Sequence, residues 1–288
     1  MLKEKLNIIL ELTKVRITVL VTVTTVFGYV LAARTISTAI ILPALGIFLL
    51  ACGSAVVNHY QEWKTDSLMA RTRNRPIPAG KISVRDVLLL AIGLALTGSM
   101  FLYLGSGLTA LLLGWLAFFW YNVVYTPLKK KSSLAVIPGS LIGAIPPVVG
   151  WVSGGGELLD PKIGVIAFFF FIWQVPHFWL LLLALGKDYE RAGFPTLTKV
   201  FSREQLIRLT FIWTAVTAIT VLLFPVYEII KTSYTGYILL VLALWLIIAS
   251  SKLLNLKSDN YSFAFKSINL FVLIVIIVVS IDKLLIIV

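Results

Sequence analysis

The sequence is short of cysteine and of charge, and each shortage narrows what the protein can be. Cys52 is the one cysteine, which excludes an intramolecular disulfide, and its apolar surroundings predict a small buried packing residue. Charged residues make up 13% of the chain and hydrophobic residues 59%, whereas soluble domains are about 25% charged. With a mean hydropathy of +0.97, the 288 residues favour a protein that exposes apolar surface to lipid.

The N-terminus also lacks the marks of a signal peptide. Its opening segment, residues 1–16, carries acids and has no short apolar run that ends at a small-residue cleavage site. We expect this segment to form an amphipathic lead-in that lies on the membrane surface.

Long apolar stretches occupy most of the rest of the chain. Each is close to the roughly 20 residues that a helix needs to cross about 30 Å of hydrocarbon. They predict an all-α integral membrane protein with nine transmembrane helices in a bundle. No soluble segment is left over, so we expect residues 1–288 to form a single domain. The stretches are residues 17–33, 39–57, 87–106, 108–124, 134–152, 163–185, 209–225, 236–250 and 268–286.

The net charge of +12 would suit nucleic acid, but its distribution indicates a membrane instead. With the N-terminus in the cytoplasm, every Lys and Arg falls on the inner side except Arg34, Lys162, Lys231 and Lys283. This bias is the positive-inside pattern, so we expect a lipid bilayer and no nucleic acid as partner. The N-terminus and the long polar loops are then cytoplasmic, and the C-terminus lies outside.

The first long inner loop, at about residues 58–86, opens with polar residues at helical spacing. Asn58, Glu62 and Asp66 share one face if the second span continues as a helix. Their oxygens suit Mg²⁺, and the following Arg71 and Arg75 suit phosphate oxygens. A solvated loop would explain the arginines, but not acids that emerge from an apolar helix, where charge is costly. The order therefore predicts a diphosphate held through Mg²⁺.

The second long inner loop, at about residues 186–208, offers a matching set. Asp188 is a candidate metal ligand and Glu190 a weaker one. Tyr189 could hold a diphosphate oxygen, and Lys187 and Arg191 suit its charge. A solvated loop of mixed charge is the alternative. The two loops lie four spans apart, which suggests two four-helix halves and a ninth helix.

Two further positions have open interpretations. His177 lies in the middle of the sixth span, directly after Pro176 and one turn after Gln174. Because proline removes a backbone hydrogen bond, the imidazole and the amide could line a pocket. A hydrogen bond to a neighbouring helix would explain the histidine equally well. Lys129, the first of three successive lysines, could set the topology or contact diphosphate.

A metal–diphosphate site at the mouth of an apolar bundle predicts an amphiphilic substrate such as a prenyl diphosphate. Mg²⁺ and cations would neutralise the leaving diphosphate, so that the allylic C–O bond ionises. An electron-rich acceptor would then capture the allylic cation. We assign catalysis to Asn58, Glu62, Asp66 and Asp188, with the three acids as metal ligands. We assign substrate binding to Arg71, Arg75, Lys129, Lys187, Tyr189, Arg191, His177 and Gln174.

Six stretches carry a resemblance to the UbiA superfamily of intramembrane prenyltransferases, and within it to the branch that farnesylates haem. The Met-x-Arg-Thr and Trp-Gln-x-Pro-His-Phe stretches of this sequence resemble that branch in particular. The last three spans match only in pattern. The stretches are residues 11–16, 58–76, 125–129, 143–151, 173–178 and 188–195.

The resemblance implies nine helices, Mg²⁺, farnesyl diphosphate as donor and haem B as acceptor. Water would complete a hydroxyethylfarnesyl side chain. The resemblance also implies a location in the plasma (cell inner) membrane of a prokaryote. As membrane partner it implies haem A synthase or cytochrome oxidase assembly. The chain departs from the family at three points. Glu62 stands where aspartate is usual, residues 13–16 lack the usual proline, and no clear second aspartate accompanies Asp188.

Other functions stay open at this point. A different member of the superfamily would prenylate a quinone precursor or another aromatic acceptor, although the haem-branch stretches argue against it. A membrane transporter or channel would also place proline, glycine and charge within its helices. Acids followed by arginines on one side suit a diphosphate better than a conduction path. A purely structural membrane subunit would leave the polar stripe unexplained.

Overall fold

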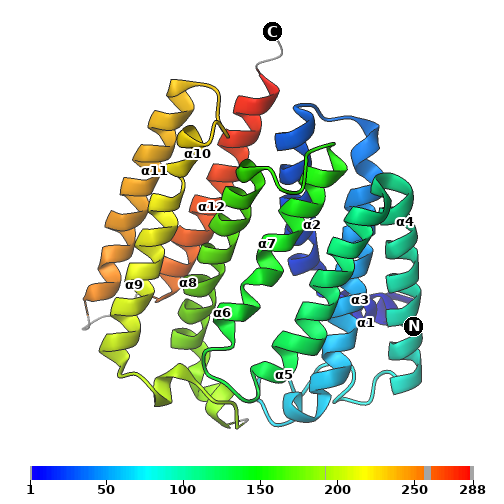
Figure 1. The fold of residues 1–288 in the computed structure, drawn as a ribbon. Helices are drawn as coiled ribbons and strands as arrows, with labels where there is room; N and C mark the ends of the chain where they lie inside the picture. Colours follow the sequence, from blue (N-terminus) through cyan, green and yellow to red (C-terminus); the bar gives the residue numbers. More distant parts are fainter. Residues whose placement is uncertain (1, 192, 256–260, 286–288) are drawn as a thin grey trace.

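The computed structural model describes residues 2–191, 193–255 and 261–285, and for residues 2, 185–189 and 191 it describes the backbone alone. Within these ranges every regular element is a helix, which confirms the predicted all-α fold (Figure 1). In chain order the elements are α1 (Leu2–Leu12), α2 (Val15–Ala33), η1 (Thr38–Ile40), α3 (Ile41–Asp66), α4 (Val84–Phe119), η2 (Trp120–Tyr125), α5 (Thr126–Leu128), α6 (Val136–Gly139), α7 (Leu141–Ser153), α8 (Pro161–Arg191), η3 (Leu197–Lys199), α9 (Arg203–Thr220), α10 (Leu223–Val226), α11 (Ser233–Ser251), η4 (Lys252–Leu254) and α12 (Tyr261–Leu284).

In the described part of the chain, 8 helical segments are long and apolar enough to cross a membrane. The third, Val84–Leu128, has 45 residues, but Gly107 interrupts it with φ 74° and ψ −168°. Glycine adopts such a conformation without the clash of a Cβ. The Trp115 indole donates to Ser99 Oγ at 3.0 Å across this break, so the chain doubles back there (Figure 1). Length and composition thus do not confirm nine separate spans, because the third and fourth predicted spans are two arms of one segment.

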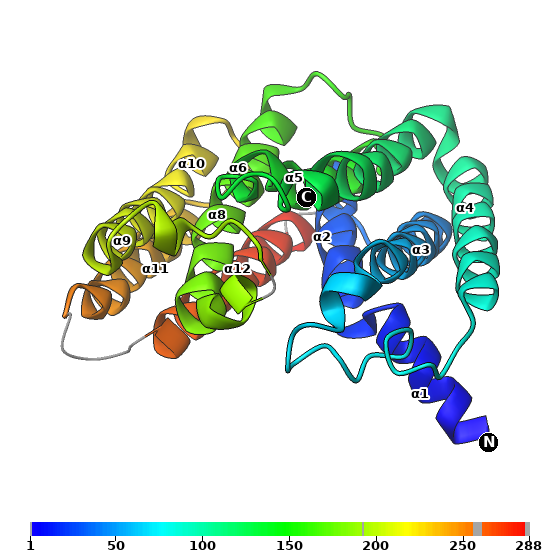
Figure 2. The ribbon, with the colours of Figure 1, turned by 90° about the horizontal axis from the view of Figure 1, so that it is seen from below.

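The long helices pack into one bundle. Seen along its length, α9 and α11 lie at one side and α4 at the other, with α2, α8 and α12 between them (Figure 2). Helix α2 packs against α3, α7 and α12, and α8 packs against α7, α9 and α12. The largest buried apolar cluster lies on the α8 side and includes Phe169, Phe170 and Phe271. Cys52 is buried, as predicted.

Helices α2 and α7 approach at two glycines. A Cβ on Gly28 would lie 1.9 Å from the carbonyl oxygen of Pro147, and one on Gly150 would lie 1.8 Å from that of Thr25. Neither position could accommodate a side chain, so glycine is required at both. Small residues serve this role in membrane bundles, where close backbone packing replaces the hydrophobic effect.

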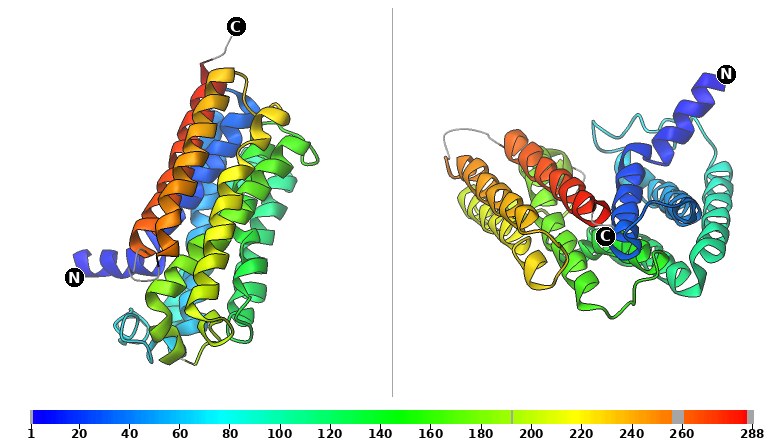
Figure 3. Two further views of the ribbon diagram at one scale, coloured as in Figure 1. Left: turned by 90° about the vertical axis from the view of Figure 1, so that its left-hand side faces the viewer. Right: turned by 90° about the horizontal axis from the view of Figure 1, so that it is seen from above.

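Helix α1 lies across the bundle rather than along it (Figure 3). It exposes Leu6, Ile9 and Leu10 on one side and buries Leu12 completely, an arrangement that suits a helix resting on a membrane surface. The chain then turns into α2 at Lys14, whose φ of 48° and ψ of 45° are left-handed. This turn directs the chain from the surface into the bundle.

The loop after α3, the link between α5 and α6, and the segment between α8 and α9 lie at the same end of the bundle (Figure 1). The helices extend further towards this end than the predicted spans do. Helix α3 continues to Asp66 and α8 to Arg191. The first part of each predicted polar loop is therefore helical, which fixes the direction of its backbone.

Candidate active site

Three polar side chains form a buried stripe at the end of α3. Asn58, Glu62 and Asp66 are 1%, 6% and 1% exposed. They share one face because α3 runs without interruption to Asp66, as their spacing predicts. Burial separates these groups from water, so each requires a polar or charged partner.

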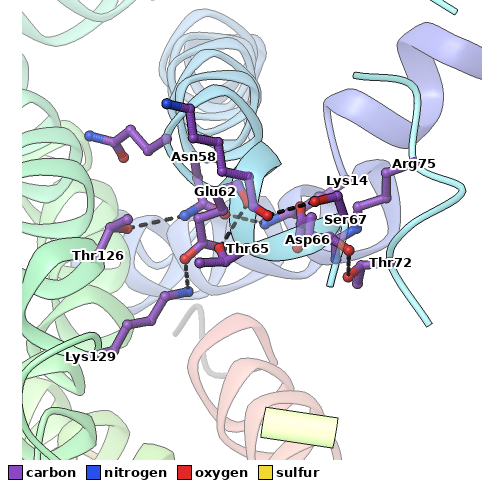
Figure 4. Close-up of polar contacts among 12 residues, drawn as sticks. Lys14, Asn58, Glu62, Thr65, Asp66, Ser67, Thr72, Arg75, Thr126 and Lys129 are labelled. Atoms are coloured by element: carbon purple, nitrogen blue, oxygen red, sulfur yellow. Dashed lines mark hydrogen bonds and ion pairs between the residues drawn. The ribbon is translucent and has the colours of Figure 1, made fainter. Parts of the chain in front are cut away.

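Cations from other segments meet both acids (Figure 4). Lys129, which follows α5, forms an ion pair with Glu62. Arg75 Nη1, in the loop after α3, lies 2.7 Å from Asp66 Oδ2. Thr72 folds this loop back onto the helix, because its hydroxyl donates to the Asp66 backbone carbonyl at 2.9 Å. Four of the predicted site residues are thus brought together as two ion pairs.

Lys14 completes the cluster, although the sequence analysis did not single it out. Its Nζ donates to Asn58 Oδ1 at 2.7 Å and to the Tyr121 hydroxyl at 3.4 Å. Burial, with a smaller effect of the Arg75 charge, lowers the pKa of Lys14 to about 8, while the two acids act in the opposite direction. Arg71 is exposed but close enough to act on the same pKa. At least four cations therefore surround the two acids, and the excess positive charge suits a polyanion.

A turn of π-helix, η2, packs against α3 beside these side chains. It stacks the rings of Tyr121 and Tyr125, whose centroids are 5.8 Å apart. Asn58 Nδ2 donates to Thr126 Oγ1 at 3.1 Å, and this hydroxyl donates to the Tyr121 carbonyl at 2.8 Å. The chain of hydrogen bonds orients the Asn58 amide with its oxygen towards Lys14. Single π turns are rare and concentrate at functional sites.

A row of aromatic rings connects this cluster with the middle of α8. Lys129 Nζ lies 5.5 Å from the ring centroid of Tyr125. The Tyr125 ring is 6.5 Å from that of Phe178, which is 5.4 Å from the His177 imidazole. Trp173 lies against the other side of the imidazole at 5.1 Å. The charged cluster and His177 thus belong to one continuous surface of side chains.

His177 is held by α12. Its Nδ1 lies 2.8 Å from Asn269 Oδ1, and the Asn269 amide nitrogen donates to the Phe265 carbonyl at 2.7 Å. The amide oxygen facing the imidazole can only accept, so His177 carries its proton on Nδ1. The lone pair of a neutral imidazole is then on Nε2. The second of the two interpretations, a hydrogen bond to a neighbouring helix, holds, and it leaves Nε2 as the acceptor nitrogen.

Gln174 lies one turn before His177 and is half-buried. Its amide packs against Gly143 of α7, where a Cβ would lie 2.3 Å from Gln174 Nε2. The amide thus occupies the contact between α7 and α8, on the helix that carries the imidazole.

The second predicted constellation falls on the last turns of α8. The side chains of Lys187, Asp188, Tyr189 and Arg191 lie outside the described residues, so their metal and diphosphate roles stay predictions. Glu190 is described, and its Oε1 accepts from the hydroxyls of Thr196, at 3.2 Å, and Thr198. The carboxylate therefore ties the following segment to the helix end.

The chain is similar in sequence to known proteins. The profile of the UbiA prenyltransferase family matches residues 21–274. The chain belongs to the UbiA prenyltransferase family. Curated relatives named protoheme IX farnesyltransferase include one from Oleidesulfovibrio alaskensis, 32% identical over 95% of both chains. Others are from Nitratidesulfovibrio vulgaris, 36% identical over 75% of both chains, and Geobacter sulfurreducens, 40% identical over 67% of this chain and 71% of the relative.

Solved structures share the fold of this chain. A digeranylgeranylglyceryl phosphate synthase aligns with a TM-score of 0.79 and 15% identity, over 98% of this chain and 99% of that one. A UbiA homologue from Archaeoglobus fulgidus, bound to GPP and Mg²⁺, aligns with a TM-score of 0.69 and 16% identity, over 97% and 100%. At these identities the likeness establishes the fold alone.

The described side chains of this prenyltransferase fit a hard divalent cation. Glu62 and Asp66 are buried one helical turn apart, and their ion pairs show that the site accommodates both negative charges. No third His, Cys, Asp or Glu joins them among the described residues. Mg²⁺ suits such a pair, because it keeps several waters and takes further oxygens from a substrate phosphate.

Sequence reasoning missed Lys14 and the roles of three uncharged side chains, Tyr121, Thr126 and Asn269. Tyr121 lies near the end of the predicted span 108–124, Thr126 lies in the stretch 125–129 that follows it, and Asn269 lies within the last predicted span. Lys14 lies within the predicted surface segment, residues 1–16, so it reads as part of the positive-inside pattern. Asn269, near the start of the last predicted span, was the one signal available, because polar residues in a membrane span are costly.

Proposed function

We propose that this prenyltransferase moves a farnesyl group from farnesyl diphosphate to a vinyl side chain of haem B and produces haem O. The observation that carries the proposal is the aromatic row from Lys129 through Tyr125 and Phe178 to His177. This row connects the charged cluster at the end of α3 with an imidazole held in one tautomer, which supports a charged head group at one end and an acceptor at the other. The names of the relatives support the choice of both substrates.

In this proposal the head group of the donor binds at the end of α3. Glu62 and Asp66, with Asp188 from α8, would hold Mg²⁺, which would neutralise the leaving diphosphate. The cations that hold its oxygens are Arg71, Arg75, Lys129, Lys187 and Arg191, together with the Tyr189 hydroxyl. Asn58, fixed between Lys14 and Thr126, faces the same anion.

The farnesyl C1–O bond breaks, and the electron pair leaves with the diphosphate. The aromatic rings of Tyr121, Tyr125 and Phe178 stabilise the allylic cation, and the surrounding bundle excludes water from it. The terminal carbon of the haem vinyl group bonds to C1, and water adds to the adjacent carbon with loss of a proton. His177 Nε2, with Gln174 nearby, positions the haem by ligating its iron or by bonding near the reacting vinyl group.

The decisive assay supplies the reconstituted protein with farnesyl diphosphate, Mg²⁺ and haem B and identifies the products by mass spectrometry. We expect haem O, and we expect a chelator to abolish it. A parallel reaction replaces haem B with 4-hydroxybenzoate. If this aromatic acid is prenylated and haem B never is, the protein acts in the quinone branch and the haem assignment is wrong. If neither acceptor is prenylated and farnesyl diphosphate does not bind, the proposed donor and acceptor are both wrong.

We further propose that the protein lies in a prokaryotic plasma membrane with its candidate active site facing the cytoplasm and its C-terminus outside. In a Cys52→Ala background, single cysteines replace the exposed residues Ala79 and Leu159, at opposite ends of the bundle. An impermeant thiol reagent added to intact cells should label only the Leu159 position. Labelling of both positions from outside would contradict this orientation.

Haem O is more apolar than haem B, so we propose that it passes within the bilayer to a membrane partner such as haem A synthase or another component of cytochrome oxidase assembly. Crosslinking in native membranes tests this proposal, with a protein of unrelated pathway at equal abundance as control. Absence of haem A synthase from the crosslinked products would argue for release into the bilayer.

A further inference from the structure

The end of the bundle opposite the candidate active site carries a second cluster of cations. Sequence placed only Arg34, Lys162, Lys231 and Lys283 on that side. The structure brings three of them, Arg34, Lys162 and Lys283, to the wall of one cavity of about 180 Å³. They come from the end of α2, the start of α8 and the end of α12, so the convergence is a property of the fold and not of one segment.

Lys283 is the most unusual member, because it is only 5% exposed. Arg34, Lys162 and Lys231 all repel its charge. Its sequence neighbour Asp282 attracts it, but that carboxylate already holds the start of α11. Asp282 Oδ2 accepts from the Lys231 backbone nitrogen at 2.7 Å, and Oδ1 accepts from the Thr232 hydroxyl at 2.7 Å.

One acid, Asp160, lines the cavity with the three cations. Its Oδ1 accepts from the backbone nitrogen of Lys162 at 2.8 Å, at the start of α8. Among the described residues, Arg34, Lys162 and Lys283 form no ion pair within 4.0 Å. Three cations thus face a single acid across a small cavity.

Such an arrangement is unfavourable unless something offsets it. Like charges at short range repel, and a buried charge without a partner is destabilising. Uncharged residues would line the same cavity without either cost. An anion with several oxygens would satisfy Arg34, Lys162 and Lys283 at once, and an arginine fork with two ammonium groups is well suited to phosphate.

We propose that this cavity is a binding site for a phosphate-class oxyanion on the face opposite the candidate active site. The rest of its wall is apolar and formed by Leu31, Trp151, Ile166 and Ile229. The Trp151 indole is already used, because it donates to the Glu157 carbonyl at 2.9 Å. The same three cations would bind either the phosphodiester of an anionic lipid or a free phosphate ion.

Thermal unfolding in lipid nanodiscs tests the proposal, because a ligand that binds only the folded state raises Tm. The protein is measured in neutral phosphatidylcholine, in phosphatidylcholine with phosphatidylglycerol, and in phosphatidylcholine with inorganic phosphate. We expect a higher Tm in at least one of the two anionic conditions. A rise with phosphatidylglycerol alone identifies a lipid headgroup, and a rise with inorganic phosphate identifies the free ion.

Lys283→Gln and Arg34→Gln should each remove most of this rise. Arg34 is exposed, so Arg34→Gln tests the site without changing a buried side chain. Lys266→Gln is the matched control, since Lys266 is an exposed lysine at the other end of α12, and it should retain the full rise. Native mass spectrometry should show one bound lipid or phosphate lost in parallel.

Lys283→Gln should also raise Tm in neutral lipid, because it removes a buried charge. The proposal is wrong if wild type gains nothing in either anionic condition. It is equally wrong if the Lys283, Arg34 and Lys266 variants all gain as much as wild type, which would reflect the general effect of a charged membrane.

Discussion

The two walls of the candidate active site differ in kind. The wall formed by α3 is charged, with Glu62 paired to Lys129 and Asp66 to Arg75. The described part of the α8 wall is aromatic, with Trp173, Phe178 and one imidazole. A prenyl diphosphate has the same division between a polyanionic head and an apolar tail. Under the proposed function, one wall would bind the leaving group and the other would accommodate the carbon skeletons that are joined.

The largest effect is expected at the charged wall. Asp66→Asn should reduce turnover by at least about a hundredfold, because a lost carboxylate removes both a metal ligand and the partner of Arg75. Glu62→Gln should act similarly. Asp86→Asn is the control, since Asp86 is exposed at the start of α4. Haem O formation at several Mg²⁺ concentrations is the measurement, and near-normal turnover in both site variants would show that the stripe does not bind metal.

At the aromatic wall, His177→Ala should separate the two substrates. Haem O formation should fall about 10- to 100-fold, while the affinity for farnesyl diphosphate stays close to that of wild type. Phe168→Ala, at a half-exposed position of the same helix, should change neither quantity. Both quantities are measured in one preparation. Normal haem O formation would remove His177 from the acceptor pocket.

A smaller effect of the same kind is expected at Asn269, which acts through His177. Asn269→Leu removes the acceptor for the Nδ1 proton, so the imidazole is no longer fixed in one tautomer. The KM for haem B should rise about five- to tenfold, with the KM for farnesyl diphosphate unchanged. Asn269→Asp retains the acceptor and should lose less. Equal changes in both KM values would indicate general damage to the bundle rather than a positioning role.

The smallest effect distinguishes the two acids at the end of α8. Glu190→Gln should leave turnover unchanged and alter the free energy of unfolding by less than about 1 kcal/mol, because its carboxylate serves Thr196 and Thr198. Asp188→Asn, by contrast, should be as damaging as Asp66→Asn if Asp188 is the metal ligand that sequence predicts. A reversed order would assign the ligand role to Glu190.

Features that depend on neighbouring residues were predictable from the sequence. Asn58, Glu62 and Asp66 lie at intervals of four, so helical geometry alone places them on one face. The reversal at Gly107 follows from the break between two apolar stretches and from the freedom of glycine. The membrane character of the chain follows from the cost of placing apolar surface in water.

Features that depend on which helices pack together were not predictable. Lys14 meets Asn58, and Asn269 meets His177, only because α2, α3, α8 and α12 adopt this arrangement. A single sequence carries no signal of such pairs, since each member has an ordinary explanation of its own. The departure noted at residues 13–16 has a structural counterpart, because Lys14 there adopts a left-handed backbone.

That backbone conformation puts folding and activity in conflict at a single position. A left-handed conformation costs an L-residue with a side chain about 1–2 kcal/mol, and glycine would remove this cost. Glycine would also remove the ammonium group that holds Asn58. Under selection for stability alone the codon should therefore drift towards glycine, and under selection for turnover it should return to lysine. A library randomised at this one codon and sorted separately for each property should yield two different consensus residues.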